Sequence, residues 1–328
     1  MTADTVVGEA AEITSWSGAD ESIKELLGKW PYLPFLECRD VSRERRVAYL
    51  VAVLASAQRR GATTFVARAD RKAQALMQWE RLPWDTRMLG LEAARVSAMY
   101  RCPGTTAVAA QRELVDRVSA EARANGTQYL VTRVSAGDII AVGQLENGGF
   151  RVVDGILNFG RPLVDLAYDN DARNVRRAVS GDIPALREIA GASFSIDRFH
   201  SDPAIGKDKA DEIQRAWVEN SVRGNADCVL VAEVGGEVAG FTTLKLDGTA
   251  ERTLGIRVGT IELVATSPRF RRRGLARILS EASLAWFRDA GCSWAEVGTQ
   301  AANIQAARVY QSAGFLLTAS SLTLRRLL

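Results

Sequence analysis

A basic stretch in the C-terminal part of the chain has the composition of an anion-binding loop. An apolar, β-prone run at 261–266 stops at Pro268, a helical apolar pattern begins after Gly274, and arginines fill the space between them. The first N–H groups of a helix have no partner inside the helix and carry partial positive charge, and a glycine lets a ligand approach closely. Arginine adds charge-assisted hydrogen bonds to phosphate oxygens. The pattern predicts a pyrophosphate site whose residues are Arg271, Arg272, Arg273, Gly274, Leu275, Ala276 and Arg277.

A second pattern follows this loop and reads Asn303-x-x-Ala306-x-x-x-Tyr310-x-x-x-Gly314-Phe315. Together with Arg271-x-x-Gly274-x-Ala276, it resembles the two signatures of the GCN5-related N-acetyltransferases (GNAT), in the family's order and at a suitable spacing. The resemblance covers about residues 175–328. It implies an enzyme that transfers an acetyl group from acetyl-CoA to an amine. Direct attack by the amine is expected, because no serine or cysteine stands in a nucleophile context.

The resemblance also assigns roles to single residues. It places the pantetheine arm of the cofactor beside the strand that precedes the loop, at Leu263, Val264, Ala265 and Thr266. A backbone N–H near Val264 or Ala265 would hold the thioester oxygen. Tyr310 would be the general acid that protonates the leaving thiolate, or else a tyrosine that only packs in the core. Asn303 would hold pantetheine, cap its helix, or do both.

The general base is less clearly marked. Glu262 lies on the strand that leads to the cofactor, and a glutamate on this strand serves as base in some members of the family. Acting through a water molecule, it would take the proton of the amine. Strand alternation also permits it to point at solvent or at a helix, and the amine could arrive already neutral.

Two further stretches are candidates for acceptor binding. Arg198 and His200 lie between two predicted helices, where the family closes over the acceptor; His200 could also be the base, or incidental. Trp84-Asp85 offers a stacking face and a hydrogen-bond acceptor, or simply a structured turn. The surrounding sequences resemble two-lobed sugar-nucleotide acetyltransferases of the TDP-fucosamine acetyltransferase type. That implies a nucleotide-linked amino sugar as acceptor. The alternatives are an amino-acid-derived metabolite, antibiotic or peptide amine, or a coenzyme-A-binding module without turnover.

The predicted elements occur twice in the same order. They include a break in the pattern at Pro83, a helix capped by Asp182, a helix at Asn303–Ala313 and a final β pair. Arg60-Gly61 matches Arg223-Gly224, and Gly149-Phe150 matches Gly314-Phe315, each before a β-prone run. We therefore predict an internal duplication with an α+β, tandem GNAT-like fold, in which each lobe has a mixed, mostly antiparallel sheet flanked by helices. The expected domains are a flexible tail at 1–20, a degenerate lobe at 21–165 and a catalytic GNAT domain at 172–328, with a seam near 163–174.

The first lobe lacks the predicted phosphate loop. At a constant offset along the chain, Arg271, Gly274 and Ala276 correspond to Thr106, Ala109 and Gln111. Arg101-x-x-Gly104 is a partial echo that is out of this register. We expect the first lobe not to bind acetyl-CoA and to form a wall of the substrate pocket.

Composition excludes several other classes of protein. The 328 residues carry a net charge of +3, which is too small for a typical nucleic-acid binder. Four scattered cysteines and one histidine argue against a disulfide framework or a metal site. The sequence shows no signal-peptide pattern and no membrane-length apolar run. We expect a cytoplasmic monomer or homodimer that acts on a small amine, without metal, nucleic acid or membrane.

Overall fold

The computed structural model describes residues 11–16, 18, 20–164 and 174–328. The chain divides into two compact units. The first contains Met1–Phe35, Val41–Val152 and Thr323–Leu328, and the second contains Leu36–Asp40 and Val153–Leu322. The predicted domain boundary between 165 and 172 lies outside the described residues, as do most of the predicted seam and residues 1–10, 17 and 19 of the predicted tail. The domain division therefore stays a prediction.

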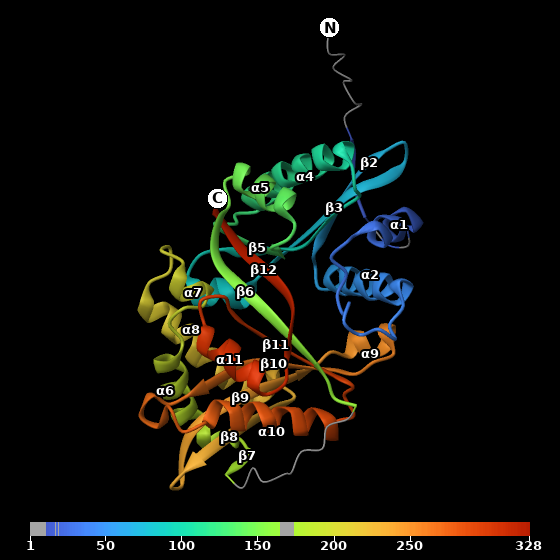
Figure 1. Cartoon of the computed structure of the whole chain (residues 1–328). Coiled ribbons are helices and arrows are strands. Elements are labelled where there is room, and N and C mark those ends of the chain that lie inside the picture. Colours follow the sequence, from blue (N-terminus) through green and yellow to red (C-terminus); the bar gives the residue numbers. More distant parts are fainter. Residues whose placement is uncertain (1–10, 17, 19, 165–173) are drawn as a thin grey trace. The chain divides into compact units, whose positions relative to one another are not determined.

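The first unit is built on five neighbouring strands of the sheet, with helices on both faces (Figure 1). Its elements are β1 (Glu12–Ser15), α1 (Glu21–Lys29), α2 (Arg43–Arg59), β2 (Thr63–Ala69), β3 (Lys72–Arg81), α3 (Pro83–Leu89), β4 (Ala93–Arg101), α4 (Thr105–Ala124), β5 (Tyr129–Ser135) and α5 (Ile139–Asn147). The strands lie in chain order; β4 and β5 are parallel and the other pairs antiparallel. On β2, Val66 packs in the cluster of α1 and α2, while its neighbour Phe65 lies under Arg117 of α4. Strand alternation thus separates the two helical layers.

The second unit repeats this arrangement around strands in the order β12-β6-β11-β10-β9-β8-β7. Its elements are β6 (Arg151–Pro162, which begins in the first unit), β7 (Val175–Arg177), α6 (Ile183–Ser193), α7 (Arg198–Ser201), α8 (Lys207–Asn220), β8 (Cys228–Val234), β9 (Glu237–Leu246), α9 (Gly248–Leu254), β10 (Val258–Thr266), α10 (Leu275–Asp289), β11 (Trp294–Gln300), α11 (Ile304–Ser312) and β12 (Leu316–Leu327, which ends in the first unit). Short 3-10 turns cover Ser180–Asp182 and Pro268–Phe270, and a π turn covers Ser221–Asn225. Helix α10 packs on β8, β9 and β10, and α6 packs on β9 and β10. The mixed, mostly antiparallel α+β fold is confirmed.

Matching turns recur at corresponding places in the two units. Left-handed glycines end α3 at Gly90 and α9 at Gly255. Asp138 caps α5 by accepting the N–H of Ala141, and Asn303 caps α11 by accepting the N–H of Ala306. The repeat extends to α3 and α9, which the sequence patterns did not reveal. Both units therefore follow one plan of strands, helices and caps.

Several predicted elements differ from the structure. Part of the predicted flexible tail, Glu12–Ser15, forms β1 and pairs with β2, because its backbone completes a sheet edge. Pro83 starts a helix, where a break in the pattern was expected, because proline is well tolerated in a first turn. The predicted final β pair is the single strand β12. Asp182 does not cap α6 through its side chain; the carboxylate accepts hydrogen bonds from Arg176 and from the N–H of Val179.

No helix in the described ranges combines the length and apolar character needed to cross a membrane.

Candidate active site

Strands β10 and β11 separate part-way along their length. Their parallel pairing joins Val258–Ile261 to residues 294–297, but β10 continues to Thr266 and β11 to Gln300. On the other side of β10, a β-bulge between Ile261 and Leu263 interrupts the register with β9. A bulge bends its strand and increases its twist. The end of β10 therefore leaves β11 and opens a gap in the sheet of the second unit.

The bulge also decides which backbone groups face this gap. Leu263 N–H donates to Thr243 Oγ1 at 3.1 Å, and Ser267 N–H donates to the Ala239 carbonyl at 2.9 Å, both on β9. In an antiparallel pair, successive residues point their backbone groups alternately toward the partner strand and away from it. The N–H of Val264 therefore points away from β9, to the side on which β11 has separated. The N–H of Ala265 points toward β9.

The predicted phosphate loop follows directly after β10. Arg272 and Gly274 both have left-handed backbone conformations, with φ of 63° and 75°. Gly274 is the N-cap residue of α10. No side chain caps α10 and no acidic residue lies in its first turn, so its free N–H groups are not neutralised locally. Phe270 is buried among Ala239, Leu275 and Leu279 and holds the loop against the sheet. This geometry is that of an anion-binding helix start.

The arginines of the loop are not equivalent. Arg269 donates to Glu237 at 2.6 Å and lies over the Phe270 ring, and Arg277 donates to Glu281 at 2.7 Å. Arg273 also lies over Phe270, 5.6 Å from the ring centre. Within the described residues, exposed Arg271 and Arg272 have no ion-pair partner. These two arginines are the ones whose guanidinium groups are available to an anionic ligand.

Tyr310 is buried in the core of the second unit. Its ring lies 6.0 Å from the ring of Phe159 on β6 and 6.0 Å from that of Phe315. Burial raises the pKa of its phenol well above the ordinary value. The hydroxyl makes no hydrogen bond with any residue in the described part of the chain. It stays protonated at neutral pH and keeps its proton available to a ligand.

Glu262 occupies the bulge of β10. Burial raises the pKa of its carboxyl; the positive charge of Lys245 opposes this shift, and the negative charge of Asp227 adds to it. Its Oε2 atom is buried and has no hydrogen-bond partner among the described residues. A half-buried carboxyl with a raised pKa is a better proton acceptor than an exposed one.

Comparison with known proteins identifies this part of the molecule. Residues 184–315 match the model of the acetyltransferase (GNAT) family. They form a GNAT-family acetyltransferase domain.

Two curated relatives extend the comparison. dTDP-fucosamine acetyltransferase of Escherichia coli O6:H1 is 27% identical over 237 residues, which cover 72% of this chain and 92% of that protein. Spore coat polysaccharide biosynthesis protein SpsD of Bacillus subtilis strain 168 is 31% identical over 135 residues, 41% of this chain and 44% of that protein. A solved tandem GNAT protein from the clavulanic acid biosynthesis pathway aligns with 97% of this chain and 98% of its own, with a TM-score of 0.53 and 14% identity. The last likeness concerns the fold alone.

On the other helical layer of the GNAT domain, His200 is part of a buried cluster. Its Nδ1 lies 2.7 Å from Asp197 Oδ2 and its Nε2 lies 2.9 Å from Asp211 Oδ1. Lys207 donates to Asp211 at 2.6 Å, and Gln214 donates to Asp197 at 3.1 Å. Both ring nitrogens are thus engaged between α7 and α8. These contacts favour a structural role for His200 over the predicted contact with the acceptor.

The other predicted acceptor residues are placed less decisively. The Arg198 guanidinium lies 4.1 Å from the centre of the Phe199 ring. Trp84 and Asp85 lie in the first turn of α3 in the first unit and are partly exposed. Their role in binding an acceptor stays a prediction.

In the first unit, the counterpart of the phosphate loop is wound into a helix. Three residues, 102–104, join β4 to α4, whereas eight residues, 267–274, join β10 to α10. The positions that correspond to Arg271–Gly274 at the constant offset, 106–109, lie inside α4. Gly104 precedes the first residue of α4 as Gly274 precedes the first residue of α10. The partial match Arg101-x-x-Gly104 therefore aligns with Arg271-x-x-Gly274 at the start of the helix, although it is out of the constant offset. No extended loop remains there to surround a pyrophosphate.

A buried ion pair lies at the end of β4 in the first unit. Pairing of β4 with β5 covers residues 93–96 and 129–132, although β4 continues to Arg101. At the end of β4, Arg101 Nη2 donates to Asp138 Oδ1 at 2.6 Å; their side chains are 9% and 1% exposed. The ion pair links β4 to the start of α5, and by element order these are the counterparts of β10 and α11 in the GNAT domain.

Proposed function

We propose that this acetyltransferase uses acetyl-CoA and transfers the acetyl group directly to the primary amine of a small hydrophilic acceptor. The observation that carries the proposal is the gap between β10 and β11, which opens beside an uncapped helix start with two unpaired arginines. The helix start and Arg271 suit a pyrophosphate. The N–H of Val264 suits the thioester oxygen, on which negative charge develops during attack.

The remaining residues would manage protons. Acetyl-CoA supplies an activated acyl group. Glu262 receives a proton from the attacking amine, directly or through water, and Tyr310 donates its proton to the thiolate as the carbon–sulfur bond breaks. Glu262 then releases its proton to solvent, and the Tyr310 phenolate takes up a proton from solvent, so both groups return to their starting states while the products are the amide and the free thiol of coenzyme A. Asn303 caps α11, the helix that carries Tyr310.

A nucleotide-linked amino sugar is the proposed acceptor class. It is supported by the 27% identity to dTDP-fucosamine acetyltransferase, which covers 92% of that protein, and by the match to a polysaccharide biosynthesis protein. Release of free thiol from acetyl-CoA, measured against amino sugars, sugar nucleotides, amino acids and peptides, tests this assignment. Turnover only with amino acids or peptides would show that the acceptor is an amino-acid or peptide amine and not an amino sugar. If the protein binds coenzyme A but acetylates none of these amines, the result would support the alternative of a coenzyme-A-binding module without turnover.

Arg271 provides the first test of the cofactor site. We expect Arg271→Gln to weaken coenzyme A binding by a factor of about ten to a hundred, because a charge-assisted hydrogen bond contributes about 1.5–3 kcal/mol. Titration calorimetry measures the change. Arg269→Gln is the matched control, since Arg269 is already paired with Glu237; its affinity should stay within about twofold. Equal losses in the two variants would speak against a specific phosphate contact at Arg271.

Glu262 provides a test by pH. Its raised pKa places the acid limb of kcat/KM above the ordinary pKa of a glutamate, 4.5. The ionised carboxylate is the active base, so activity is present above the raised pKa and falls as the pH is lowered through it. Glu262→Gln is expected to lower kcat/KM about a hundredfold near neutral pH and to remove this limb. An unchanged pH profile in the variant would mean that the amine needs no base at Glu262.

A further inference from the structure

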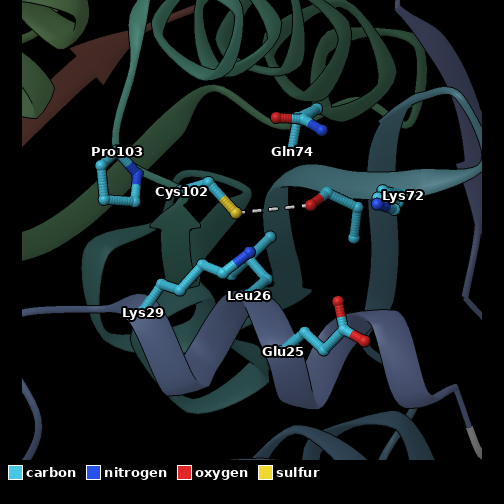
Figure 2. A pocket seen from close by; sticks show the side chains of 8 residues that line it. Glu25, Leu26, Lys29, Lys72, Gln74, Cys102 and Pro103 are labelled. Atoms are coloured by element: carbon cyan, nitrogen blue, oxygen red, sulfur yellow. Dashed lines mark hydrogen bonds between the residues drawn. The ribbon is translucent and has the colours of Figure 1, made fainter.

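The first unit contains a cavity of about 280 Å³ at the place where its short loop leads into α4. Figure 2 shows that three segments line it: α1 (Glu25, Leu26, Lys29), the start of β3 (Lys72, Ala73, Gln74) and the residues before α4 (Cys102, Pro103). All eight lining residues belong to the first unit. The cavity is therefore separate from the gap between β10 and β11.

The internal repeat explains why a cavity exists here. In the second unit the corresponding loop is longer, its turn Pro268–Phe270 packs against α6, and Ser193 at the end of α6 donates to the Thr266 carbonyl at 3.1 Å. Helix α1 is the counterpart of α6 by element order, and Cys102-Pro103 is the counterpart of Ser267-Pro268. The shorter loop of the first unit contains no such turn. The space that the second unit fills with its own chain is thus left open beside α1.

The lining of the cavity has two chemical layers. Its floor is apolar and buried, with Leu26, Ala73 and Cys102 at most 7% exposed. The Cys102 thiol makes a weak hydrogen bond to the Ala73 carbonyl at 3.5 Å. Its rim is polar: Lys29 and Lys72 have no ion-pair partner within the described residues, and Glu25 supplies one opposing carboxylate. Burial raises the pKa of the Cys102 thiol. The charge of Lys29 lowers this pKa and the charge of Glu25 raises it, which agrees with both charged groups lying near the apolar floor.

We propose that this cavity binds a small organic anion: an apolar body of a few carbon atoms on the floor, and a phosphate or carboxylate group held by Lys29 and Lys72. The volume of about 280 Å³ lies just below the range of about 300–1,000 Å³ that ligand sites occupy, which fits a ligand of few atoms. Two unpaired ammonium groups outweigh one carboxylate, so the rim favours an anion. The apolar floor favours a ligand with a hydrocarbon portion over an inorganic ion.

Phenyl phosphate titrated into the full-length protein tests the proposal, with excess coenzyme A present to occupy the loop before α10. Benzoate, inorganic phosphate and phenol are titrated in parallel. We expect phenyl phosphate or benzoate to bind at least about tenfold more tightly than inorganic phosphate and phenol. Only these two compounds combine a hydrocarbon ring for the apolar floor with an anionic group for Lys29 and Lys72. Preference between the first two identifies the anionic group. No saturable binding of either, or equal binding of inorganic phosphate, would overturn the proposal.

Variants assign the binding to this cavity. The double variant Lys29→Gln with Lys72→Gln changes exposed side chains and is expected to weaken binding about tenfold or more. Lys24→Gln on the same helix is the control, since Lys24 pairs with Glu21 and does not line the cavity. Binding unchanged in the double variant, or weakened equally by Lys24→Gln, would overturn the assignment. The result is independent of acetyl transfer, whose own tests use Arg271, Glu262 and Tyr310.

Discussion

Replacing Tyr310 by phenylalanine is expected to lower kcat about a hundredfold, which is a typical loss when a general acid is removed. The ring packs between Phe159 and Phe315, and phenylalanine preserves those contacts while it removes only the hydroxyl. The affinity for coenzyme A should therefore stay within about twofold, because no binding contact is assigned to the hydroxyl. Steady-state thiol release, together with calorimetric titration of coenzyme A, measures the two effects separately.

Tyr310→Ala is the matched comparison for packing. It leaves a cavity in the core and is expected to destabilise the fold by about 3–5 kcal/mol, which the phenylalanine variant should not do. If Tyr310→Phe turns over at the wild-type rate while folding normally, the tyrosine is only a core residue, and another group or water protonates the thiolate.

Removing Asp138 is expected to have the largest effect on stability. Asp138→Ala leaves the buried Arg101 guanidinium without its counter-charge, and it also removes the cap of α5. Breaking one partner of a buried ion pair costs about 3–5 kcal/mol. Urea unfolding followed by circular dichroism measures the loss.

Two control variants test whether the loss of stability comes from leaving a charge buried without its partner. Arg117→Ala breaks the exposed pair with Glu121 on α4 and also removes the contact of Arg117 with the Phe65 ring; together these losses should cost no more than about 2 kcal/mol. Arg101→Met combined with Asp138→Ala removes both buried charges and should recover part of the lost stability. A loss in Asp138→Ala no larger than that in Arg117→Ala would contradict the view that the buried ion pair between β4 and α5 stabilises the first unit.

The features that could be predicted from the sequence are local ones. The loop before α10 combines Pro268, Gly274 and a run of arginines, and its function depends on backbone conformations that neighbouring residues dictate. Helices with caps, such as α11 after Asn303, were also predicted within one or two residues. The family resemblance rested on these same local patterns, and the match of residues 184–315 to the family model confirms it.

Features that depend on strand register could not be predicted. The bulge at Glu262 decides which way the Val264 N–H points, but a bulge is a property of the pairing between β9 and β10. A one-residue shift reverses the faces of a strand, and sequence alternation cannot show where such a shift occurs. Edge strand β1 was missed for the same reason, since its residues gain their structure from pairing with β2.

Long-range polar contacts were equally hidden. His200 was predicted to meet the acceptor, act as base or be incidental, because it lies between two predicted helices where the family closes over the acceptor. Its partner Asp211 belongs to the next helix. Nothing in the sequence distinguishes Asp211 from the other acidic residues of that helix. The ion pair of Arg101 with Asp138 joins residues 37 positions apart. Only the folded chain brings these charges together.

A crystal structure of the full-length protein with acetyl-CoA tests the central claim most directly. The account predicts one molecule of cofactor, with its pyrophosphate at the start of α10 beside Arg271 and Gly274, and its thioester oxygen within hydrogen-bond distance of the Val264 N–H. A cofactor bound at the start of α4, or one whose pantetheine arm lies outside the gap between β10 and β11, would contradict it.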